Sequence, residues 1–539
     1  MAQDRRPITP LLPLLLSLAV VAGLFIGHGL DRGRGGPLAL LKLRQPSAAD
    51  KIVQVLDLID RQYVDTVEKN ALVEEVLQEL LQRLDPHSYY ISAAELRAAQ
   101  EPLEGSFDGI GVEFSIQRDT VVVVAAVEGG PSEALGIRAG DRILAADDKP
   151  LSNVGITNDG VMRTLRGPKG SEVTVSLKRP GRAEAFDVTI RRGKIPINSV
   201  AVALLSSDGT GYIKLSRFAK NTHQEFLDAA RNLRDAGMQR LVLDLRGNGG
   251  GYLNSAIELA DEFLKRDQVI VYTQGRNSPR RDVKATDRGM FHDLPLAVLI
   301  DEGSASASEI VAGAVQDHDR GVIVGRRSFG KGLVQEHVDL PDRSAIRLTT
   351  ARYYTPSGRS IQRPYGEGVD YGRDLEARQA HGEFFSADSI RTDSALRYTT
   401  AAGRIVFGGG GIMPDVFVPA DTAEGSQYLT ELFFSGTLNQ FAFDVADRDR
   451  DRLLRFGSYR SFNERYQISD ALLRELGRFA EEQGIKERPD DLARSRQWIA
   501  TRLKANIARN LWGNAGFYDI MLGTDRIYLR AEEELGAGT

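Results

Sequence analysis

The chain has 539 residues, of which 42% are hydrophobic and 27% are charged, and its net charge at pH 7 is −5. A chain of this length exceeds one compact core, so we expect three or more domains. The composition excludes a largely disordered protein, and the mild negative charge gives no reason to expect nucleic acid as a partner. Cysteine is absent, which excludes disulfides, thiolate zinc sites and a cysteine nucleophile.

The N-terminus carries the pattern of an export signal. Arg5 and Arg6 precede an uncharged apolar run at residues 11–27. A bilayer-spanning helix needs roughly 17 to 25 apolar residues, so this run is at the short end of the range. No A-x-A-like cleavage site follows, and the arginine pair favours an exported main part. We predict a signal anchor at residues 1–30, with a cleaved signal peptide and a buried helix as the alternatives.

Two amphipathic helices are predicted after a linker. Residues 31–46 are rich in Gly, Arg and Pro, as linkers are. Residues 47–104 form a predicted N-terminal helical region, in which D-P-H-S at residues 85–88 ends the second helix. The apolar positions with helical spacing are Ile52, Val55, Leu56, Ile59, Leu72, Val76, Leu80 and Leu84.

From Gly105 the pattern changes to short strands separated by turns. Strands are predicted at residues 112–116 and 121–127, and residues 105–194 have the length of a small β-rich domain. The last segment, residues 421–539, is strongly charged with helical spacing, which predicts a C-terminal helical extension.

Residues 195–420 alternate strands and helices, which predicts an α/β domain. A strand at 241–245 is followed by a Gly-rich turn and a helix through residues 253–264. A strand at 296–300 precedes a helix that begins at about Ala305. The chain as a whole is therefore predicted to be multidomain α/β.

A candidate nucleophile lies in the strand, small-residue turn and helix start at residues 298–310. A serine on such a turn can expose its hydroxyl beside the free N–H groups of a helix N-terminus, and these donors suit a developing oxyanion. The candidates are Ser304, Ser306 and Ser308, each of which could instead cap the helix.

A nucleophilic serine needs a base, and the sequence offers two. His318 is twelve residues after Ser306, or ~18 Å along one helix at ~1.5 Å per residue, so it cannot serve from that helix. His337 remains, as does Lys331 between two glycines. A lysine base requires a pKa that falls from ~10.4 towards ~7–8, which burial can cause.

The sequence G-S-A-S-A-S-E at residues 303–309 and S-F-G-K-G-L-V-Q at residues 328–335 together resemble the Ser–Lys site of the C-terminal processing (tail-specific) protease family. The resemblance implies that Ser306 is the nucleophile, that Lys331 is the general base, and that Gln335 orients the lysine amine.

The same resemblance implies an oxyanion hole. One N–H would come from Ala307, after the nucleophile. The other would come from the Gly-rich turn at residues 244–251, where we assign Gly250, with Gly249 and Gly251 as alternatives. The family's catalytic fold is crotonase- or Clp-protease-like α/β.

The resemblance covers about residues 48–420, and the extension at 421–539 lies beyond the minimal family pattern. Several matches in the family's order support it. They are L-D-P-H-S at 84–88, G-I-G-V at 109–112, Y-Y-T-P-S-G-R-S-I at 353–361 and G-I-M-P-D at 411–415.

The family places a PDZ domain at residues 105–194. The loop formed by Gly109, Ile110, Gly111 and Val112 would hold a free C-terminal carboxylate with its N–H groups, while the peptide adds as a strand. A helix at 159–165 would border the groove. The residues expected to face the peptide from it are Val161 and Leu165.

Nucleotide binding is disfavoured. Residues 325–331 fit G-x-x-x-x-G-K, but Gly332 stands where a P-loop needs Ser or Thr, and a strand-like segment follows instead of a helix. The turn at 244–251 fails G-x-G-x-x-G because Tyr252 replaces the third glycine.

We therefore expect a serine endopeptidase, without cofactor or metal, that cuts exported proteins near their C-termini. Its expected partners are protein substrates with apolar free C-terminal tails and, through the anchor, the membrane. The expected location is the bacterial inner membrane with the catalytic part in the periplasm. An adaptor and a homo-oligomer remain open. The alternatives are a catalytically silent PDZ scaffold and a crotonase-like acyl-transfer enzyme.

Overall fold

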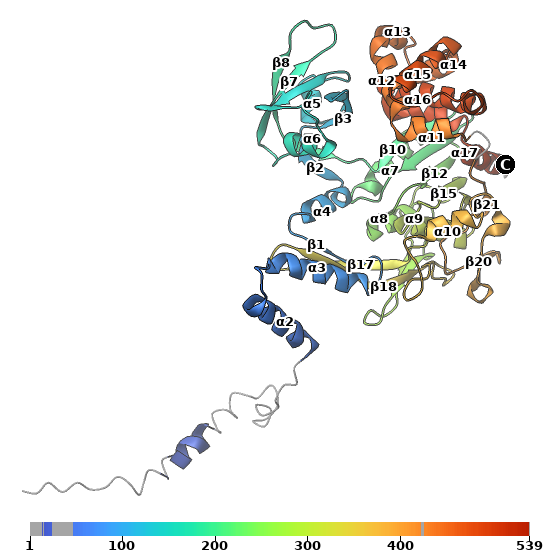
Figure 1. The fold of residues 1–539 in the computed structure, drawn as a ribbon. Helices are drawn as coiled ribbons and strands as arrows, with labels where there is room; N and C mark the ends of the chain where they lie inside the picture. The colour runs from blue at the N-terminus through green and yellow to red at the C-terminus, as the bar shows by residue number, and fades with distance from the viewer. Residues whose placement is uncertain (1–12, 14–15, 24–46, 422–424, 538–539) are drawn as a thin grey trace, which may run out of the picture. The chain divides into compact units, whose positions relative to one another are not determined.

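The computed structural model describes residues 13, 16–23, 47–421 and 425–537 (Figure 1). Most of the predicted signal anchor and the whole predicted linker lie outside these residues. None of the helices in the described ranges combines the length and the apolar character that a bilayer crossing needs. The chain divides into two units, residues 1–77 and 78–539.

The first unit contains helix α2 (Ala48–Gln62) and most of α3 (Lys69–Gln82), the two helices predicted from the apolar spacing. A capping box begins α2. The Asp50 N–H donates to the Ser47 hydroxyl (3.3 Å), and the Ser47 N–H donates to the Asp50 carboxylate (2.7 Å). This pairing satisfies two N–H groups that the helix start leaves without a partner.

The second unit opens with β1 (Tyr89–Ile91) and α4 (Leu96–Glu104) and then enters a β-rich domain. Strands β2 (Ser106–Gly109) and β9 (Gly193–Pro196) pair where the chain enters and leaves this domain. Its sheet has the order β3-β4-β5-β7-β8, and within the described residues β3 pairs only with β4, so one edge of β3 has no strand beside it there. The strands are β3 (Val112–Gln117), β4 (Thr120–Ala126), β5 (Arg142–Ala146), β6 (Lys149–Pro150), β7 (Glu172–Lys178) and β8 (Phe186–Arg191); the helices are α5 (Pro131–Ala134) and α6 (Asn158–Leu165).

A six-stranded, mostly parallel sheet forms the centre of the α/β domain. Only β10 runs antiparallel to its neighbour. The strand predicted at residues 296–300 is β15, and all five of its residues are buried. An all-apolar strand is expected here because helices cover both faces of a parallel sheet. In spatial order the strands are β10 (Val200–Leu205), β11 (Thr210–Leu215), β12 (Arg240–Asp244), β15 (Leu296–Ile300), β16 (Val322–Gly325) and β21 (Val416–Phe417).

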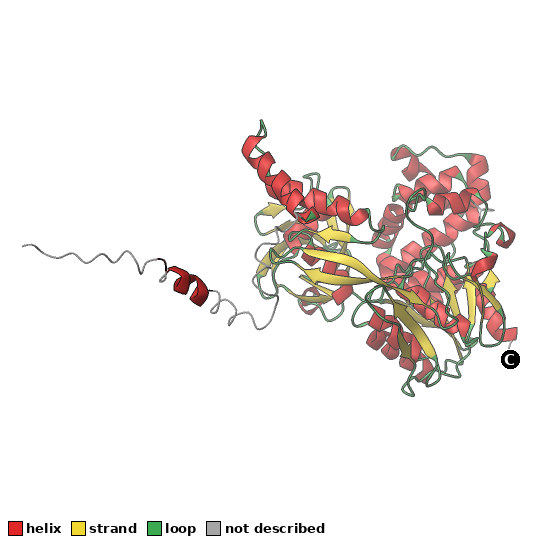
Figure 2. Cartoon of the chain, turned by 90° about the horizontal axis from the view of Figure 1, so that it is seen from below, coloured by secondary structure: helices red, strands yellow, loops and turns green. Residues whose placement is uncertain are grey.

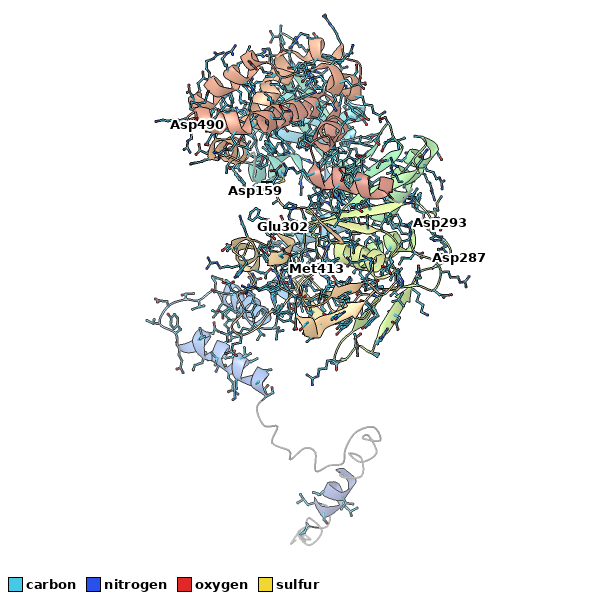
Figure 3. The ribbon with its side chains drawn as sticks, turned by 90° about the vertical axis from the view of Figure 1, so that its right-hand side faces the viewer. Asp159, Asp287, Asp293, Glu302, Met413 and Asp490 are labelled. Carbon is cyan, nitrogen blue, oxygen red and sulfur yellow. The ribbon has the colours of Figure 1, made fainter. Side chains whose placement is uncertain are left out.

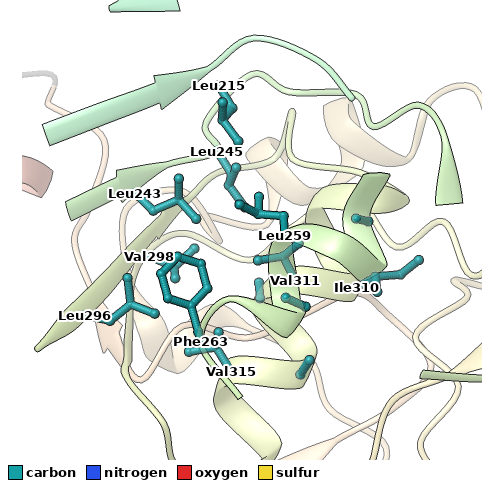
Figure 4. Close-up of a cluster of buried hydrophobic side chains, with 14 of the residues drawn as sticks. Leu215, Leu243, Leu245, Leu259, Phe263, Leu296, Val298, Ile310, Val311 and Val315 are labelled. Atoms are coloured by element: carbon teal, nitrogen blue, oxygen red, sulfur yellow. The ribbon is translucent and has the colours of Figure 1, made fainter. Parts of the chain in front are cut away.

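One face of this sheet packs against α7 (Thr222–Asp235), α8 (Leu253–Asp261) and α9 (Ala307–Asp317). Figure 4 shows Leu243 and Val298 from the strands in contact range of Leu259, Phe263 and Val311 from the helical side. This core fixes where α9 begins, and the start of α9 carries the candidate nucleophile.

A second sheet has the order β1-β18-β13-β14, and β17 pairs with β18. Figure 2 draws the strands of the chain in yellow. The ladder between β17 and β18 shifts register between Val334 and Gln335, which is a β-bulge. Its remaining strands are β13 (Val269–Gln274), β14 (Arg281–Lys284), β17 (Leu333–Asp339) and β18 (Ala345–Tyr354). The segment after it contains α10 (Asp374–Ala380), β19 (Arg397–Thr399) and β20 (Ile405–Phe407).

The C-terminal region is helical, as its spacing predicted, and it has a core of its own. It also completes the α/β domain, because α17 covers the face of the central sheet opposite α9 with Ile527, Tyr528, Ala531 and Leu535. Two ion pairs of 2.8 Å join α12 to the β-rich domain, Arg118 with Asp444 and Arg142 with Asp447. The helices are α11 (Gln427–Phe434), α12 (Thr437–Arg448), α13 (Arg450–Leu454), α14 (Tyr459–Arg465), α15 (Asp470–Glu482), α16 (Pro489–Leu522) and α17 (Arg526–Ala537).

Candidate active site

Ser306 occupies the strained turn between β15 and α9. Its φ is 55° and its ψ is −111°, a backbone conformation that residues other than glycine rarely adopt. Strain of this kind costs of the order of 1–3 kcal/mol and persists where the surrounding structure enforces it, often at active sites. The Ser306 N–H donates to Glu309 (2.8 Å), and its carbonyl accepts from the Tyr353 hydroxyl (3.1 Å).

The two neighbouring serines have different surroundings. Ser304 is fully buried and donates to the carbonyl of Leu245 (2.8 Å), and Ser308 is fully buried and donates to the carbonyl of Asn248 (2.8 Å). Both hydroxyls therefore hold the nucleophile turn against the Gly-rich turn. Of the three candidates, only Ser306 lines the adjacent cavity.

Lys331 lines the same cavity, which has a volume of about 710 Å³. Its amine donates to Gln335 Oε1 (3.1 Å). Burial lowers the pKa of this amine, and the positive charge of Arg347 lowers it further. Both effects favour the neutral amine, which is the form that can accept a proton from a serine.

The two histidines lie differently. His318 ends α9, at the opposite end of the helix from Ser306, and its Nε2 is 2.7 Å from the carbonyl oxygen of Val269. His337 lines the cavity, but it is exposed and its Nε2 lies 3.0 Å from a carboxylate oxygen of the exposed Asp339. Exposure thus distinguishes the two candidate bases, because Lys331 is partly buried and His337 is exposed.

Glu309 joins the nucleophile and the base, which the sequence did not indicate. One carboxylate oxygen accepts the N–H of Ser306 (2.8 Å) and of Lys331 (2.9 Å). The other accepts the Ser328 hydroxyl (2.5 Å) and the Gly330 N–H (2.7 Å). The side chain is fully buried, and burial raises its pKa to about 7 against the opposing effect of these four bonds.

We expect Glu309→Ala to lower the free energy of unfolding by about 4 kcal/mol, because four buried or partly buried donors lose their acceptor at about 1–3 kcal/mol each and neighbouring groups recover part of that loss. Activity should fall as well, since both the Ser306 and the Lys331 backbones lose their common anchor. Thermal unfolding and peptide hydrolysis measure the two effects. Glu336→Ala, at an exposed position of β17, is the matched control and should change stability by less than about 0.5 kcal/mol. Equal stability of the two variants would contradict the anchoring role.

The two N–H groups predicted to form the oxyanion hole, those of Ala307 and Gly250, differ in whether they already donate to a protein acceptor. No described residue accepts the Ala307 N–H, which belongs to the first turn of α9. Gly250 has a φ of 96°, and a Cβ there would lie 2.8 Å from Ser306 Cβ, so only glycine fits. However, the Gly250 N–H donates to Asn248 Oδ1 (2.9 Å). In this conformation the Gly250 N–H is not available to a substrate, while those of Gly249 and Gly251 have no acceptor among the described residues.

Ion pairs and carboxylates fix the loops around the nucleophile turn. Asp301 accepts the N–H of Gly247 (2.8 Å) and of Gly303 (2.9 Å), which ties the turn after β12 to the turn after β15. Glu302, labelled in Figure 3, pairs with Arg326 (2.9 Å).

In the part of the chain that the structure describes, no cluster of three or more His, Asp or Glu side chains could hold a metal ion.

The predicted carboxylate loop of the β-rich domain has the expected backbone form. Gly111 has a φ of 76°, and a Cβ there would lie 3.0 Å from Ile195 Cδ1. The carbonyl of Ile110 accepts the N–H and the hydroxyl of Ser132. No described residue accepts the N–H of Ile110 or Gly111. Gly109 ends β2 and Val112 begins β3, so the loop leads into the strand with the unpaired edge.

The two residues predicted to face the peptide from the groove helix lie in the core of the β-rich domain. Val161 and Leu165 of α6 are 0% and 4% exposed and belong to the core of the domain, so in this conformation they offer almost no surface to a peptide. Alternate residues of β3, namely Val112, Phe114 and Ile116, pack on the same core but keep part of their surface exposed. Strand periodicity could have indicated these three, since they share one face of the edge strand.

Comparison with known proteins agrees with this geometry. Residues 209–371 match peptidase family S41, and residues 109–190 match the PDZ domain. Residues 428–513 match a family of unknown function, DUF8443.

Related proteins cover about two thirds of the chain. A carboxy-terminal-processing protease of Bartonella bacilliformis is 37% identical over 64% of this chain and 78% of its own length. The carboxy-terminal processing protease CtpB of Bacillus subtilis is 34% identical over 65% of this chain and 72% of its own length. Among solved structures, the photosystem II D1 C-terminal processing protease is 28% identical, with a TM-score of 0.36 over 69% of this chain and 93% of its own. The chain therefore belongs to the carboxy-terminal-processing proteases, serine peptidases of family S41 with a PDZ domain.

Proposed function

We propose that the protein is an endopeptidase that cuts exported proteins near their C-termini through a Ser306–Lys331 acyl-enzyme mechanism. The observation that carries this proposal is the partly buried Lys331 amine in the same cavity as Ser306 on its strained turn. Ser–Lys pairs are an established variant of the catalytic triad, in which a neutral amine replaces histidine.

The chemistry follows from these positions. Ser306 Oγ attacks the scissile carbonyl carbon while its proton passes to Lys331 Nζ. The intermediate's oxygen then faces the N–H groups at the start of α9, beginning with Ala307. Collapse breaks the C–N bond, and Lys331 returns its proton to the leaving amine. Water attacks the acyl-enzyme with Lys331 as base, which releases the new C-terminus and Ser306.

The PDZ domain would supply the substrate's tail. A free carboxylate fits the unbonded N–H groups of Ile110 and Gly111, and an extended peptide can pair with the open edge of β3. The partly exposed apolar residues of β3 favour an apolar tail. Binding the tail raises the local concentration of the substrate at the peptidase.

We expect a peptide with an apolar free C-terminus to bind the full-length Ser306→Ala protein more tightly than its amidated form, by about tenfold or more. Amidation removes the charge that the loop amides would hold, and a hydrogen bond to a charged group contributes about 1.5–3 kcal/mol. Fluorescence anisotropy with labelled peptides measures both affinities. Equal binding of the two forms would refute the carboxylate loop.

The exported location rests on the sequence of the first 30 residues, where an arginine pair precedes the uncharged run at residues 11–27. The proposal is an inner-membrane anchor with the catalytic part in the periplasm. Fractionation and protease accessibility in intact spheroplasts test it. A full-length protein recovered in the cytosolic fraction and protected from external protease would contradict it.

The cellular activity is best tested by comparing protein C-termini in cells that carry the wild-type chain or Ser306→Ala. Shortened C-termini should be present only with wild type, and they should map to exported proteins with apolar tails. An identical set of C-termini in both strains would remove the proposed function.

A further inference from the structure

The D-P-H-S turn at residues 85–88 is a closed hydrogen-bonded unit. Asp85 is 7% exposed, and its Oδ1 accepts the N–H of His87 (2.8 Å) and of Ser88 (2.9 Å). Its Oδ2 accepts the Ser88 hydroxyl (2.6 Å). A carboxylate that accepts three donors holds the backbone of the turn in one conformation.

This turn is attached to the strand that faces Gln335. The Thr349 N–H donates to the Ser88 hydroxyl (3.0 Å), and the Thr349 hydroxyl donates to Asp85 Oδ1 (3.1 Å). Thr349 lies on β18 directly opposite Gln335 on β17. The D-P-H-S turn and Gln335 therefore share Thr349 as a fixed neighbour.

Gln335 reaches the turn through its side-chain amide. Gln335 follows a shift in the ladder, because Val334 pairs with Ala351 and Gln335 with Thr349, which leaves Thr350 of β18 as the extra residue of the bulge. Gln335 Nε2 donates to the main-chain carbonyl of His87. A carbonyl oxygen can only accept, so the amide group must present Nε2 to His87 and Oε1 to the amine of Lys331.

The reversed amide would be unfavourable at His87 in either protonation state of Lys331, because Gln335 Oε1 would face the His87 carbonyl, one acceptor against another. At Lys331 it would be unfavourable for the protonated amine, which has no lone pair to accept from Nε2. The orientation seen here gives Lys331 an acceptor in both of its protonation states. One N–H of the neutral amine is then engaged by Gln335, which restricts where its lone pair points.

We propose that Asp85 is a positioning residue for proton transfer: through the turn it holds the His87 carbonyl that locks the Gln335 amide and thereby orients the Lys331 amine. The proposal rests on Lys331 being the base in the proposed function. The role belongs to the carbonyl of His87, so it does not require the His87 imidazole. Burial lowers the pKa of that imidazole to about 4, which keeps it neutral.

A double-mutant cycle on the full-length enzyme tests this proposal. Asp85→Ala and Gln335→Ala should each lower kcat by about 10- to 30-fold with KM within about twofold, because misplacing a catalytic group slows chemistry more than binding. If Asp85 acts through Gln335, the double variant should be no slower than the slower single variant. Multiplied losses of about 100-fold or more would overturn the proposal.

The pH profile separates positioning from mere structure. Losing the Gln335 acceptor, or the Asp85 charge, removes stabilisation of the protonated amine, so the apparent pKa of kcat should shift downward in both single variants. Asp85→Asn can still accept the N–H groups of His87 and Ser88, so it should restore kcat to within about threefold of wild type at high pH. An Asn variant as slow as Asp85→Ala would contradict the turn as the cause.

Asp342→Ala is the matched control. Asp342 also accepts an N–H (3.0 Å) and a hydroxyl (2.6 Å), both from Ser344. It lies in the loop that joins β17 to β18, away from Gln335. It should leave kcat and the pH profile unchanged, and an equal loss of kcat in this variant would overturn the proposal.

Two further variants keep the outcomes separable. If Asp85→Ala does not fold, Ser88→Ala takes its place in the cycle, and its smaller loss should likewise vanish in the Gln335→Ala background. Lys331→Ala is measured alongside. An active Lys331→Ala enzyme refutes the Ser–Lys mechanism itself, whereas an inactive one combined with additive Asp85 and Gln335 effects refutes only the positioning role.

Discussion

Ser306→Ala should leave a folded protein whose kcat/KM for a tailed substrate is reduced by more than about 10³-fold. The substitution removes the oxygen that attacks the carbonyl. The side chain is small and lies at the cavity rather than in the core, so the thermal unfolding midpoint should stay nearly unchanged. Hydrolysis of a peptide with an apolar free C-terminus and a thermal melt measure the two quantities.

The neighbouring serines provide matched controls for this result. Ser304→Ala and Ser308→Ala should retain more activity, yet each should lower the free energy of unfolding by about 1 kcal/mol for each hydrogen bond lost. Ser308 loses its bond to Asn248, and Ser304 loses the bond to Leu245 and the one it accepts from Asp301. Ser306→Gly should be inactive and at least as stable as Ser306→Ala, because glycine adopts the positive φ of this position without strain. Full activity in Ser306→Ala would end the assignment of the nucleophile.

The central sheet and the position of the nucleophile turn could be predicted because their signals are local. The strand Leu296–Ile300 is an uninterrupted apolar run, and a strand covered on both faces has to be one. Small residues after it mark the turn, and α9 begins two residues after the predicted start at Ala305. The spacing to Lys331 carried the resemblance, while the shared cavity became visible only in the fold.

Contacts between distant segments could not be predicted in this way. Glu309 reads in the sequence as an ordinary helix-start acid, but the fold surrounds it with donors from two separate loops. The composition of the Gly-rich turn likewise does not predict that the Asn248 side chain accepts the Gly250 N–H. Val161 and Leu165 have the right spacing for one helix face, but periodicity cannot say whether that face meets the core or a ligand.

The C-terminal region illustrates the same limit. Its helical character followed from spacing, but the partner of its last helix did not. The apolar stripe of α17 covers the central sheet, and Asp525 just before it pairs with Arg246 of the Gly-rich turn (2.7 Å). An extension beyond the usual family pattern is thus part of the core of the peptidase domain and touches the turn that borders the nucleophile.

Lys331→Arg should be inactive, with kcat/KM reduced by more than about 10³-fold, although it keeps the positive charge. A guanidinium stays protonated at any usable pH, so it cannot accept the Ser306 proton. In wild type, burial and Arg347 lower the pKa of the Lys331 amine, so the neutral fraction at a given pH is larger than for a free lysine. Activity should therefore rise with pH through an apparent pKa below ~10.4.

The decisive comparison sets Lys331→Arg against His337→Ala on one tailed substrate from about pH 6 to about pH 10, a range that includes the ordinary pKa of histidine and ends just below that of lysine. His337 is exposed and lies beside Asp339, so its loss should leave most of the activity and the same pH profile. His318→Ala should behave likewise, because that ring lies at the far end of α9. A base at Lys331 also predicts that the rise with pH shifts in Gln335→Ala but not in His337→Ala. An active Lys331→Arg enzyme together with an inactive His337→Ala enzyme would instead place the base at His337 and make this a histidine-dependent hydrolase.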